Sequence, residues 1–288
     1  MTFANPVEKL VKKRFSCRSY LSQPVEEQTR QKLADYAAAL QTGPFGAQMR
    51  FELVAAHEKD QKTLKNLGTY GFIQGAAGFI IGIIQDDEKN LEDFGYLMES
   101  IILFATDMGL STCWLGGTFT KSSFSQRVSP RLGELIPAVT ALGYCAKKPR
   151  RFDALIRNSA DADRRLSWEQ LFFDSRFGAP LSRTMAGDYT KALEMVRRAP
   201  SASNKQPWRI VKDAHMWHFY LQRTPGYRER MLVRLFTVAD IQRIDMGIAM
   251  SHFELMARDH GLDGRWEIIP PAIEMPDEFT EYTVSWVS

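Results

Sequence analysis

The sequence predicts an α+β protein made of two tandem copies of one unit, and three observations carry this prediction. Helix-like and strand-like segments alternate along the chain without strict βαβ regularity. Residues 93–114 align without gaps on residues 245–266, so the chain repeats itself. With 288 residues, it is also long enough for two units of ordinary domain size. We therefore expect one repeat over 1–156 and a second over 157–288, arranged around mixed or antiparallel sheets.

The internal repeat has a constant offset of 152 residues, as between Asp93 and Asp245. The order of elements around it repeats as well: helix, loop with a glutamine, strand, long helix, short strand and final strand. Identical residues at this offset include Asp93/Asp245, Gly95/Gly247, Met98/Met250, Ala105/Ala257, Asp107/Asp259, Gly109/Gly261, Leu110/Leu262 and Trp114/Trp266.

Two helices are expected at the start of the first repeat. Asn5 can cap the first helix, with Pro6 at its first helical position and Glu8 three residues after the cap. The second helix is expected to begin at Pro24 and to carry an apolar stripe that includes Leu33.

The rest of the first repeat alternates strands with one long helix. Strand-like runs occupy 51–56 and 77–84, and the second run is far below the ~20 apolar residues of a membrane span. A long helix is expected over 88–109, ending at a glycine. Residues 111–117 and 138–144 then predict a short strand and a longer one.

A well-marked helix precedes an unusual loop in the second repeat. The sequence GDYTKALEMVRR (187–198) places Ala192, Leu193 and Val196 on one helical face. Pro200 then ends the helix, since proline has no N–H and disfavours helix in the residue before it. The loop that follows, in APSASNKQPWR (199–209), offers small side chains that let a flat ligand approach the backbone.

Composition and charge exclude several classes of function. A net charge of +3 is too small to indicate nucleic-acid binding, and only 146–151 is a basic cluster, short enough to suit one phosphate. The three cysteines have no C-x-x-C spacing, which favours a reducing compartment, and no H-E-x-x-H metal motif occurs. The first residues have no apolar signal-peptide core, so the expected location is the cytoplasm.

Two further segments have the composition of binding sites. RFSCR (14–18) places two guanidinium groups and a hydroxyl within five residues, and arginine forks match phosphate oxygens bidentately. CWLGGTFTK (113–121) has two glycines after a strand, which let backbone N–H groups approach a ligand. It is not a Walker-type phosphate loop, because Leu115 and Thr120 occupy both of the required glycine positions.

Together these segments resemble the FMN-dependent nitroreductase family. RFSCRSY is similar to the family's R-x-S-x-R-x-[FY] signature, and APSASNKQPWR is similar to its A-P-S-x-x-N-x-Q-P-W loop. GLSTCWLGG and ALGYCAKKPRR resemble its later flavin-binding segments. The resemblance implies an α+β fold that binds FMN tightly and noncovalently. It further implies an oxidoreductase that transfers a hydride from NAD(P)H through flavin N5 to a nitroaromatic or quinone-type acceptor.

The resemblance also implies roles for individual residues. Arg14, Ser16 and Arg18 would hold the phosphate, ribityl chain and pyrimidine edge of FMN, while Gly116 and Gly117 would approach N5 and O4. Lys148 and Arg151 would close over the phosphate, although the choice among the four basic residues of 146–151 stays open, and Tyr70 would face the site. Pro200, Ser201, Ala202, Asn204 and Gln206 would border the rings. Phe15 and Leu115 complete the expected cofactor-binding set, and no catalytic residue is expected.

The two family signatures are divided between the two repeats. Family members form homodimers whose FMN lies at the interface and uses one signature from each subunit. In this chain R-x-S-x-R stands only in the first repeat, whose loop slot reads QTGPFGAQMR (41–50), and the intact loop stands only in the second. We therefore expect a monomer that acts as a fused pseudo-dimer, with one working FMN site.

Two alternatives stay open beside the reductase. The fold could serve a flavin-binding or structural protein with little or no turnover. It could also serve one of the family's other reactions, namely deiodination, dehydrogenation or flavin fragmentation. The natural acceptor and the choice between NADH and NADPH are left open.

Overall fold

A computed structural model describes residues 3–55, 64, 67–117, 119–147, 150, 153–154, 161, 164–227 and 239–288. The first half contains α1 (Val7–Lys13), α2 (Glu27–Ala39), β1 (Met49–Ala55), β2 (Gly78–Gln85), α4 (Asn90–Asp107), β3 (Ser111–Leu115), α5 (Lys121–Val128), β4 (Glu134–Leu135) and β5 (Val139–Gly143). The second half contains α7 (Trp168–Leu171), β6 (Phe172–Asp174), α8 (Arg183–Ala186), η1 (Gly187–Tyr189), α9 (Thr190–Arg198), η2 (Ala202–Asn204), β7 (Trp208–Asp213), β8 (Met216–Gln222), α11 (Ile241–Asp259), β9 (Arg265–Glu267) and β10 (Thr280–Val287).

The two halves form two sheets with the same strand order. The first sheet runs β1-β2-β5-β3, with β4 beside β2, and the second runs β6-β7-β8-β10-β9. Apart from β4 and β6, strand β1 corresponds to β7, β2 to β8, β5 to β10 and β3 to β9. The strands pair antiparallel, except that β6 runs parallel to β7. The architecture is therefore α+β with two tandem units, as the sequence predicts.

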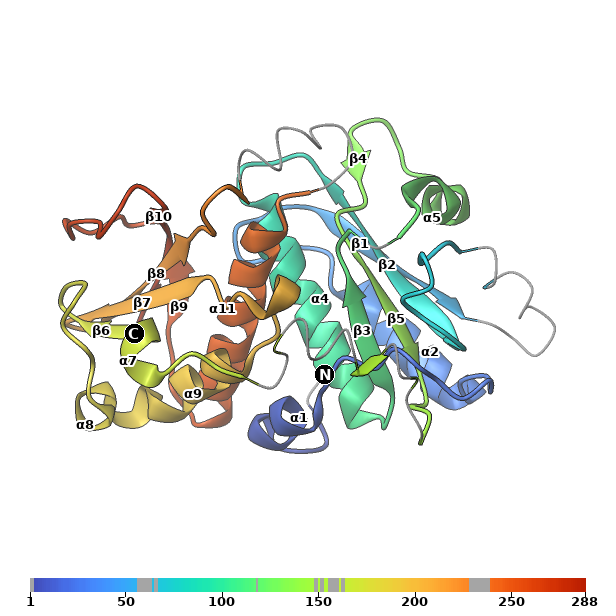
Figure 1. Cartoon of the computed structure of the whole chain (residues 1–288), viewed down its shortest axis with the longest axis horizontal. Helices are drawn as coiled ribbons and strands as arrows, with labels where there is room; N and C mark the ends of the chain where they lie inside the picture. Colours follow the sequence, from blue (N-terminus) through green and yellow to red (C-terminus); the bar gives the residue numbers. More distant parts are fainter. Residues whose placement is uncertain are drawn as a thin grey trace.

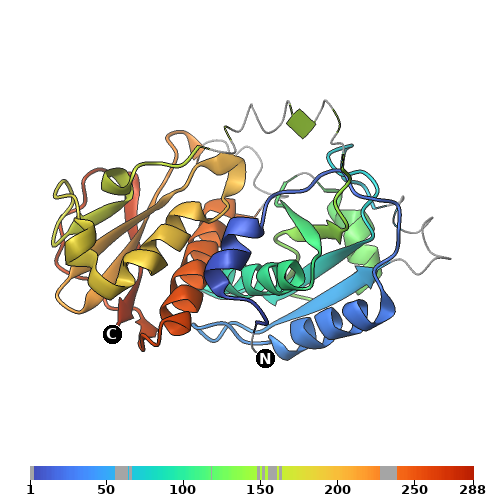
Figure 2. The same ribbon diagram turned by 90° about the horizontal axis from the view of Figure 1, so that it is seen from below.

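The long helices α4 and α11 lie side by side between the two sheets (Figure 1; Figure 2). They carry the two copies of the internal repeat. A Cβ on Gly95 would overlap the carbonyl oxygen of Ile244, and one on Gly247 would overlap that of Glu92. Glycine at both repeated positions therefore lets the two backbones approach more closely than side chains would allow.

Burial of the central layer follows from its composition. Helix α4 is apolar on most of its surface, as expected for a helix covered on all sides, and 16 of its residues are buried. Strand β2 has apolar side chains on both faces, with Ile80 and Ile84 in the core shared by the two halves. Phe79 and Ile81 point to the other face, where Phe124 of α5 covers them. The shared core is thus continuous from one sheet to the other.

Two expected helix starts are wrong in detail. Asn5 does not cap α1, because its side-chain amide donates to Asp107 at 2.7 Å and its oxygen accepts from Lys9 at 2.9 Å. Helix α2 begins at Glu27, three residues after Pro24, so the proline belongs to the preceding connection. The expected boundary between residues 156 and 157 lies outside the described residues and stays a prediction.

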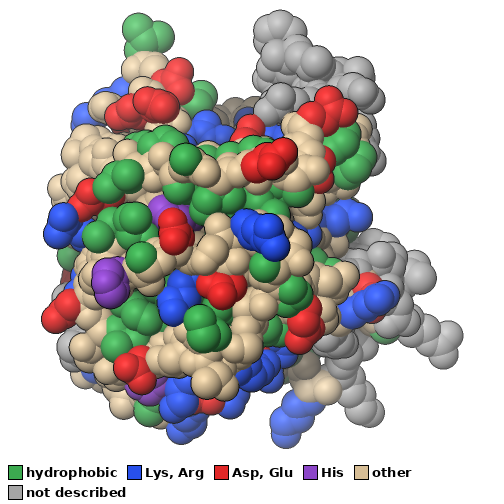
Figure 3. Space-filling view, turned by 90° about the vertical axis from the view of Figure 1, so that its left-hand side faces the viewer, with side chains coloured by type: hydrophobic (Ala, Val, Ile, Leu, Met, Phe, Trp, Pro, Cys, Tyr) green, Lys and Arg blue, Asp and Glu red, His purple; other side chains and the backbone are tan. Residues whose placement is uncertain are grey.

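The surface shows no dominant charge on the face that the second half presents. Acidic and basic side chains are interspersed there with hydrophobic ones (Figure 3). Among the described helices, none is long and apolar enough to cross a membrane.

Candidate functional site

A pocket of about 810 Å³ is built from both halves of the chain. The first half contributes residues after α1 and the end of β3, and the second half contributes the loop after α9 and the first turns of α11. The lining residues are Val11, Lys12, Arg14, Phe15, Ser16, Arg18, Phe72, Cys113, Trp114, Leu115, Gly116, Gly117, Ala138, Arg165, Arg197, Arg198, Pro200, Ser201, Ala202, Ser203, Asn204, Ile241, Ile244, Asp245 and Ile248.

The R-x-S-x-R segment is extended, which explains its spacing. Helix α1 ends at Lys13, and the chain then pairs with β3 through a bridge from Ser16 to Thr112. Alternate side chains of an extended segment point the same way, so Arg14, Ser16 and Arg18 all line the pocket. Cys17 points away from them and is buried in the core.

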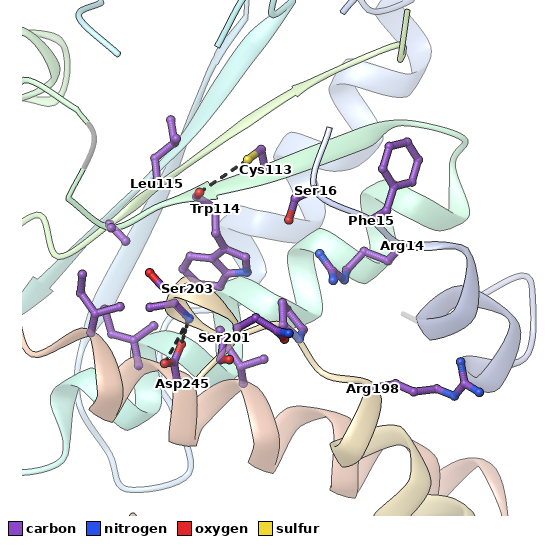
Figure 4. Close-up of a pocket in the computed structure, with 18 of the residues that line it drawn as sticks. Arg14, Phe15, Ser16, Cys113, Trp114, Leu115, Arg198, Ser201, Ser203 and Asp245 are labelled. Atoms are coloured by element: carbon purple, nitrogen blue, oxygen red, sulfur yellow. Dashed lines mark hydrogen bonds between the residues drawn. The ribbon is translucent and has the colours of Figure 1, made fainter. Parts of the chain in front are cut away.

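Arg14 is a buried cation with unused donors. Its side chain is only 6% exposed, yet Nε and Nη1 have no hydrogen-bond partner among the described residues. The carboxylate of Glu99 lies 3.8 Å from Nε, which is too far for a hydrogen bond. Arg14 reaches toward Trp114 and Ser201, whereas the Phe15 ring points the other way (Figure 4). Its free N–H groups are therefore available to an anion in the pocket.

The loop after α9 holds three residues in the left-handed region. Ser203, Asn204 and Gln206 have φ values of 49°, 54° and 49°, a conformation that costs non-glycine residues free energy. Both carboxyl oxygens of Asp245 accept from the backbone N–H of Ala202, at 3.0 and 3.2 Å (Figure 4). The N–H of Gln206 donates to Ser201 Oγ at 2.8 Å. These bonds hold the loop in its strained shape.

The side-chain amides of Asn204 and Gln206, in this loop, form their hydrogen bonds with other parts of the protein. Asn204 lines the pocket, but its Nδ2 donates to the carbonyls of Asp161 and Arg164, at 2.7 and 2.8 Å. Its Oδ1 accepts from Arg165 at 3.1 Å. Gln206 does not line the pocket, and its Oε1 accepts from the N–H of Leu166 at 2.9 Å. Both amides fasten the loop to the segment that leads into the second half.

Asp245 is buried at the lining of the pocket, and burial shifts the pKa of its carboxyl group. Desolvation raises its pKa well above the ordinary value, and the bond from Ala202 offsets only part of that effect. The equivalent Asp93 accepts from the N–H groups of Phe45 and Ala47. Burial raises its pKa to about 6. The repeated aspartate thus has the same loop-holding role in both halves.

The two glycines after β3 line the pocket as expected, and one of them has a second role. A Cβ on Gly116 would lie 3.0 Å from Cδ1 of Ile241, so the glycine lets α11 of the second half pack against this turn. Gly117 has ordinary space, with the nearest atom at 4.0 Å.

Three expected residues lie elsewhere or outside the described part. Tyr70 does not line the pocket and its side chain is 67% exposed. Lys148 and Arg151 are outside the described residues. Their neighbour Arg150 is occupied by the protein itself, donating to Ser19, to the carbonyls of Gly71 and Phe72, and to Asp153.

Sequence reasoning missed one side of the pocket. Arg165, Arg197 and Arg198 add positive charge from the second half, and the consecutive arginines at the end of α9 were a usable signal. Ile241, Ile244 and Ile248 of α11 form an apolar wall with Trp114. Their spacing of three and four residues is that of one helix face, which could have identified them. Among the described residues, no cluster of three or more His, Cys, Asp or Glu could hold a metal ion.

The family described as "Putative TM nitroreductase" matches residues 6–257. The chain is similar to the solved structure of a "putative nitroreductase" from Thermotoga maritima, with 16% identity and a TM-score of 0.61 over 100% of this chain and 95% of that one. A nitroreductase family protein from Clostridium difficile 630 aligns with 22% identity and a TM-score of 0.40, over 51% of this chain and 87% of that one. One from Clostridium novyi aligns with 20% identity and a TM-score of 0.41, over 52% and 90%.

No curated protein matches the chain. The Thermotoga structure shows that the fold is shared from one end of the chain to the other. The family match covers most of both halves, including the R-x-S-x-R segment and the loop after α9. The chain therefore belongs to this family of nitroreductase-type proteins.

Proposed function

We propose that this chain is an FMN-dependent oxidoreductase that uses NADH or NADPH to reduce a nitroaromatic or quinone-type acceptor. Membership of the nitroreductase-type family supports the reaction class. The pocket supports the cofactor, because the two segments that resemble the flavin signatures both line it.

The pocket suits a flat, largely apolar ring system with a charged tail. Its volume of about 810 Å³ is within the usual range for cofactor and ligand sites. Trp114, Ile241 and Ile244 supply apolar surface, and the loop residues Ser201 and Ala202 are small enough for close approach. The residues present therefore fit FMN.

One observation carries the proposal furthest, namely the buried guanidinium of Arg14. A buried charge is costly unless it is paired and hydrogen-bonded, and Nε and Nη1 of Arg14 have no hydrogen-bond partner among the described residues. A phosphate or another anionic group of the ligand would accept those donors. Arg14 thus indicates an anion in this pocket.

The proposed roles follow the positions of the described side chains and, for Lys148 and Arg151, the resemblance of the sequence alone. Arg14, Ser16 and Arg18 would bind the phosphate, ribityl chain and pyrimidine edge, with Lys148 and Arg151 as further phosphate ligands. Gly116 and Gly117 would present backbone N–H groups to the ring. Pro200, Ser201, Ala202 and Asn204 would border it, Gln206 would fix the loop, and Phe15 and Leu115 would lie at its margins, whereas Tyr70 lies outside the pocket.

Bound FMN would supply two-electron chemistry, taking a hydride from the reduced nicotinamide and giving electrons to the acceptor. The chain's own residues would bind and orient the cofactor, and the apolar wall of α11 would exclude water from one side. We name no proton donor from the protein. One such site would exist per chain, because the two signatures meet once.

The purified protein tests the proposal directly. We expect flavin absorption bands after addition of FMN and anaerobic bleaching of these bands by NADH or NADPH. A quinone or nitroaromatic should then restore them. Flavin that binds but stays oxidised in excess of both nucleotides would favour the flavin-binding protein without turnover. Failure to bind FMN would overturn the proposal as a whole.

A further inference from the structure

A buried network of hydrogen-bonded side chains lies next to Arg14, at the junction of the two halves. Glu99 of α4 is fully buried and lies 3.8 Å from Arg14 Nε. Its Oε2 accepts from Trp114 Nε1 at 2.7 Å. Its Oε1 lies 2.9 Å from Nε2 of His252, which is a fully buried residue of α11. This network thus links His252 of the second half to the pocket through Glu99.

The hydrogen bonds fix how many protons the pair holds. Nδ1 of His252 lies 3.1 Å from the carbonyl oxygen of Met195, which can only accept, so Nδ1 carries a proton. The 2.9 Å bond between Nε2 and Glu99 needs a second proton, because two lone pairs would otherwise face each other. That proton is either on the imidazole or on the carboxyl group. In both arrangements the pair as a whole is neutral.

Because the pair is neutral as a whole, it offsets only part of the positive charge of Arg14, although Glu99 lies within ion-pair distance of Nε, at 3.8 Å. If Glu99 were ionised beside a neutral partner, its carboxylate would cancel much of the charge of Arg14, because a carboxylate near a guanidinium attracts it strongly inside a protein. His252 prevents this by supplying the proton. Trp114 and His252 hold the two oxygens of Glu99 in place, and Nε and Nη1 of Arg14 make no hydrogen bond to either of them.

The pseudo-symmetry of the chain supports a role specific to this side. The offset of the repeat equates Glu99 with Ser251 and Ser100 with His252. The equivalent pair, Ser100 and Ser251, is also in contact, with the two hydroxyl oxygens 3.2 Å apart. It is uncharged. The ionisable pair of Glu99 and His252 therefore stands on the side of the α4–α11 crossing that faces Arg14.

We infer that His252 is a positioning residue: the proton that it shares with Glu99 keeps this carboxyl from binding the guanidinium of Arg14 tightly, so that Nε and Nη1 stay free to bind the ligand's phosphate. The inference rests on the proposed function only for the identity of the ligand. It predicts an unusual order of effects, because removing the histidine should harm anion binding more than removing the glutamate. A merely structural role predicts losses of similar size in the two variants, since each side chain makes two hydrogen bonds.

Three variants with glutamine substitutions distinguish the positioning role from a merely structural one. In His252→Gln the amide still donates to Glu99 but brings no charge, so the glutamate would pair with Arg14. In Glu99→Gln the amide can donate to His252 and accept from Trp114, and Arg14 keeps its charge. In the double variant Glu99→Gln/His252→Gln the two amides can bond to each other, again leaving Arg14 unpaired. Ser251→Ala is the matched control from the equivalent uncharged pair.

The readouts are the thermal stabilisation of the protein by inorganic phosphate and the affinity for FMN in a fluorescence titration. We expect His252→Gln to weaken the affinity for phosphate and the affinity for FMN by about tenfold or more. This is the usual effect of losing a charge-assisted hydrogen bond. Glu99→Gln, the double variant and Ser251→Ala should stay within about threefold of the native protein.

The outcomes are distinct from those of the proposed function. Native affinity in His252→Gln, or a loss in Glu99→Gln as large as that in His252→Gln, would overturn the inference even if FMN turnover is normal. Stabilisation by phosphate with this order of effects would support the inference even in a protein that does not reduce FMN. If His252→Gln does not fold, Glu99→Gln alone decides, because retained affinity supports the inference and lost affinity overturns it.

Discussion

Gly95 and Gly247 face each other where α4 crosses α11, and neither position has room for a methyl group. A Cβ on Gly95 would approach the Cα of Gly247 to 3.2 Å and overlap the carbonyl oxygen of Ile244. The two glycines occupy equivalent positions in the internal repeat. The contact that joins the two halves is thus made by the repeated sequence itself, and it brings the opposite signatures into one pocket.

Replacement of Gly247 by alanine should destabilise the whole chain. The new methyl group would overlap the backbone of Glu92, which cannot move without shifting α4. We expect a loss of at least about 1–3 kcal/mol in the free energy of unfolding, measured by urea titration. Gly117→Ala is the control, with its nearest neighbour at 4.0 Å, and should change stability by no more than about 0.5 kcal/mol. Equal stability of both variants would contradict the close crossing.

Replacement of Arg14 by alanine should weaken FMN binding. The loss of a buried charge-assisted contact corresponds to about 1.5–3 kcal/mol, or roughly tenfold to more than a hundredfold in affinity. Fluorescence titration of the apoprotein measures it. Arg198→Ala is the control, since this arginine is 42% exposed and pairs with Glu194, and it should have a much smaller effect. Unchanged affinity in Arg14→Ala would mean that this arginine does not hold the cofactor.

Asp93 should make the protein less stable as the pH rises. Burial raises its pKa from 3.8 to about 6, so the folded state holds the proton more tightly than the unfolded state does. The free energy of unfolding should therefore fall between about pH 4 and pH 6, by up to roughly 3 kcal/mol from this group, and level off above. Asp93→Asn should lack this contribution when urea unfolding is compared across that range. Parallel pH profiles for the two proteins would contradict the assignment.

Replacement of Asn204 by alanine should disturb the same flavin as Arg14→Ala does, although the residues stand in different halves. Its amide fastens the strained loop to the carbonyls of Asp161 and Arg164. Without these bonds the loop should lose its pocket-forming shape, with weaker FMN affinity in the titration. The matched control is Gln48→Ala, which changes the glutamine of the other loop and whose side chain contacts Thr42 and Gly46. If both variants bind FMN like the native chain, the loop after α9 is not part of the site.

The fold could be predicted because the sequence of the buried helix α4 aligns without gaps on that of α11, which reveals the two tandem units. Local pattern also identified β1, β2, β3 and β5 of the first half, where β2 has a continuous apolar run, but it did not identify β4 or β6. The start of α1 was predicted to within one residue, but its cap was not, because the Asn5 side chain bonds to Asp107, a hundred residues away in sequence. The bond to Asp107 is a tertiary contact, and the local capping pattern in the sequence does not indicate it.

Only the part of the site that lies in one continuous sequence motif could be predicted. In R-x-S-x-R the period of an extended segment predicts that Arg14, Ser16 and Arg18 lie on one side, and all three line the pocket. The wall of α11 and the pairing of Glu99 with His252 depend on how two distant helices cross. The amides of Asn204 and Gln206 were expected to border the ligand, yet they bind the segment around Arg164, a contact that no spacing in the sequence indicates.

The ratio of bound FMN to protein chains, measured together with the mass in solution, tests the central claim most directly. Arg14, Ser16 and Arg18 stand in the first half and the intact loop stands in the second, so a complete site is expected once per chain. We predict one FMN per chain in a monomer of about the sequence mass of 32.9 kDa, with binding that survives dilution because both halves are covalently joined. Two FMN per chain, or binding that is lost as a dimer dissociates, would contradict the account.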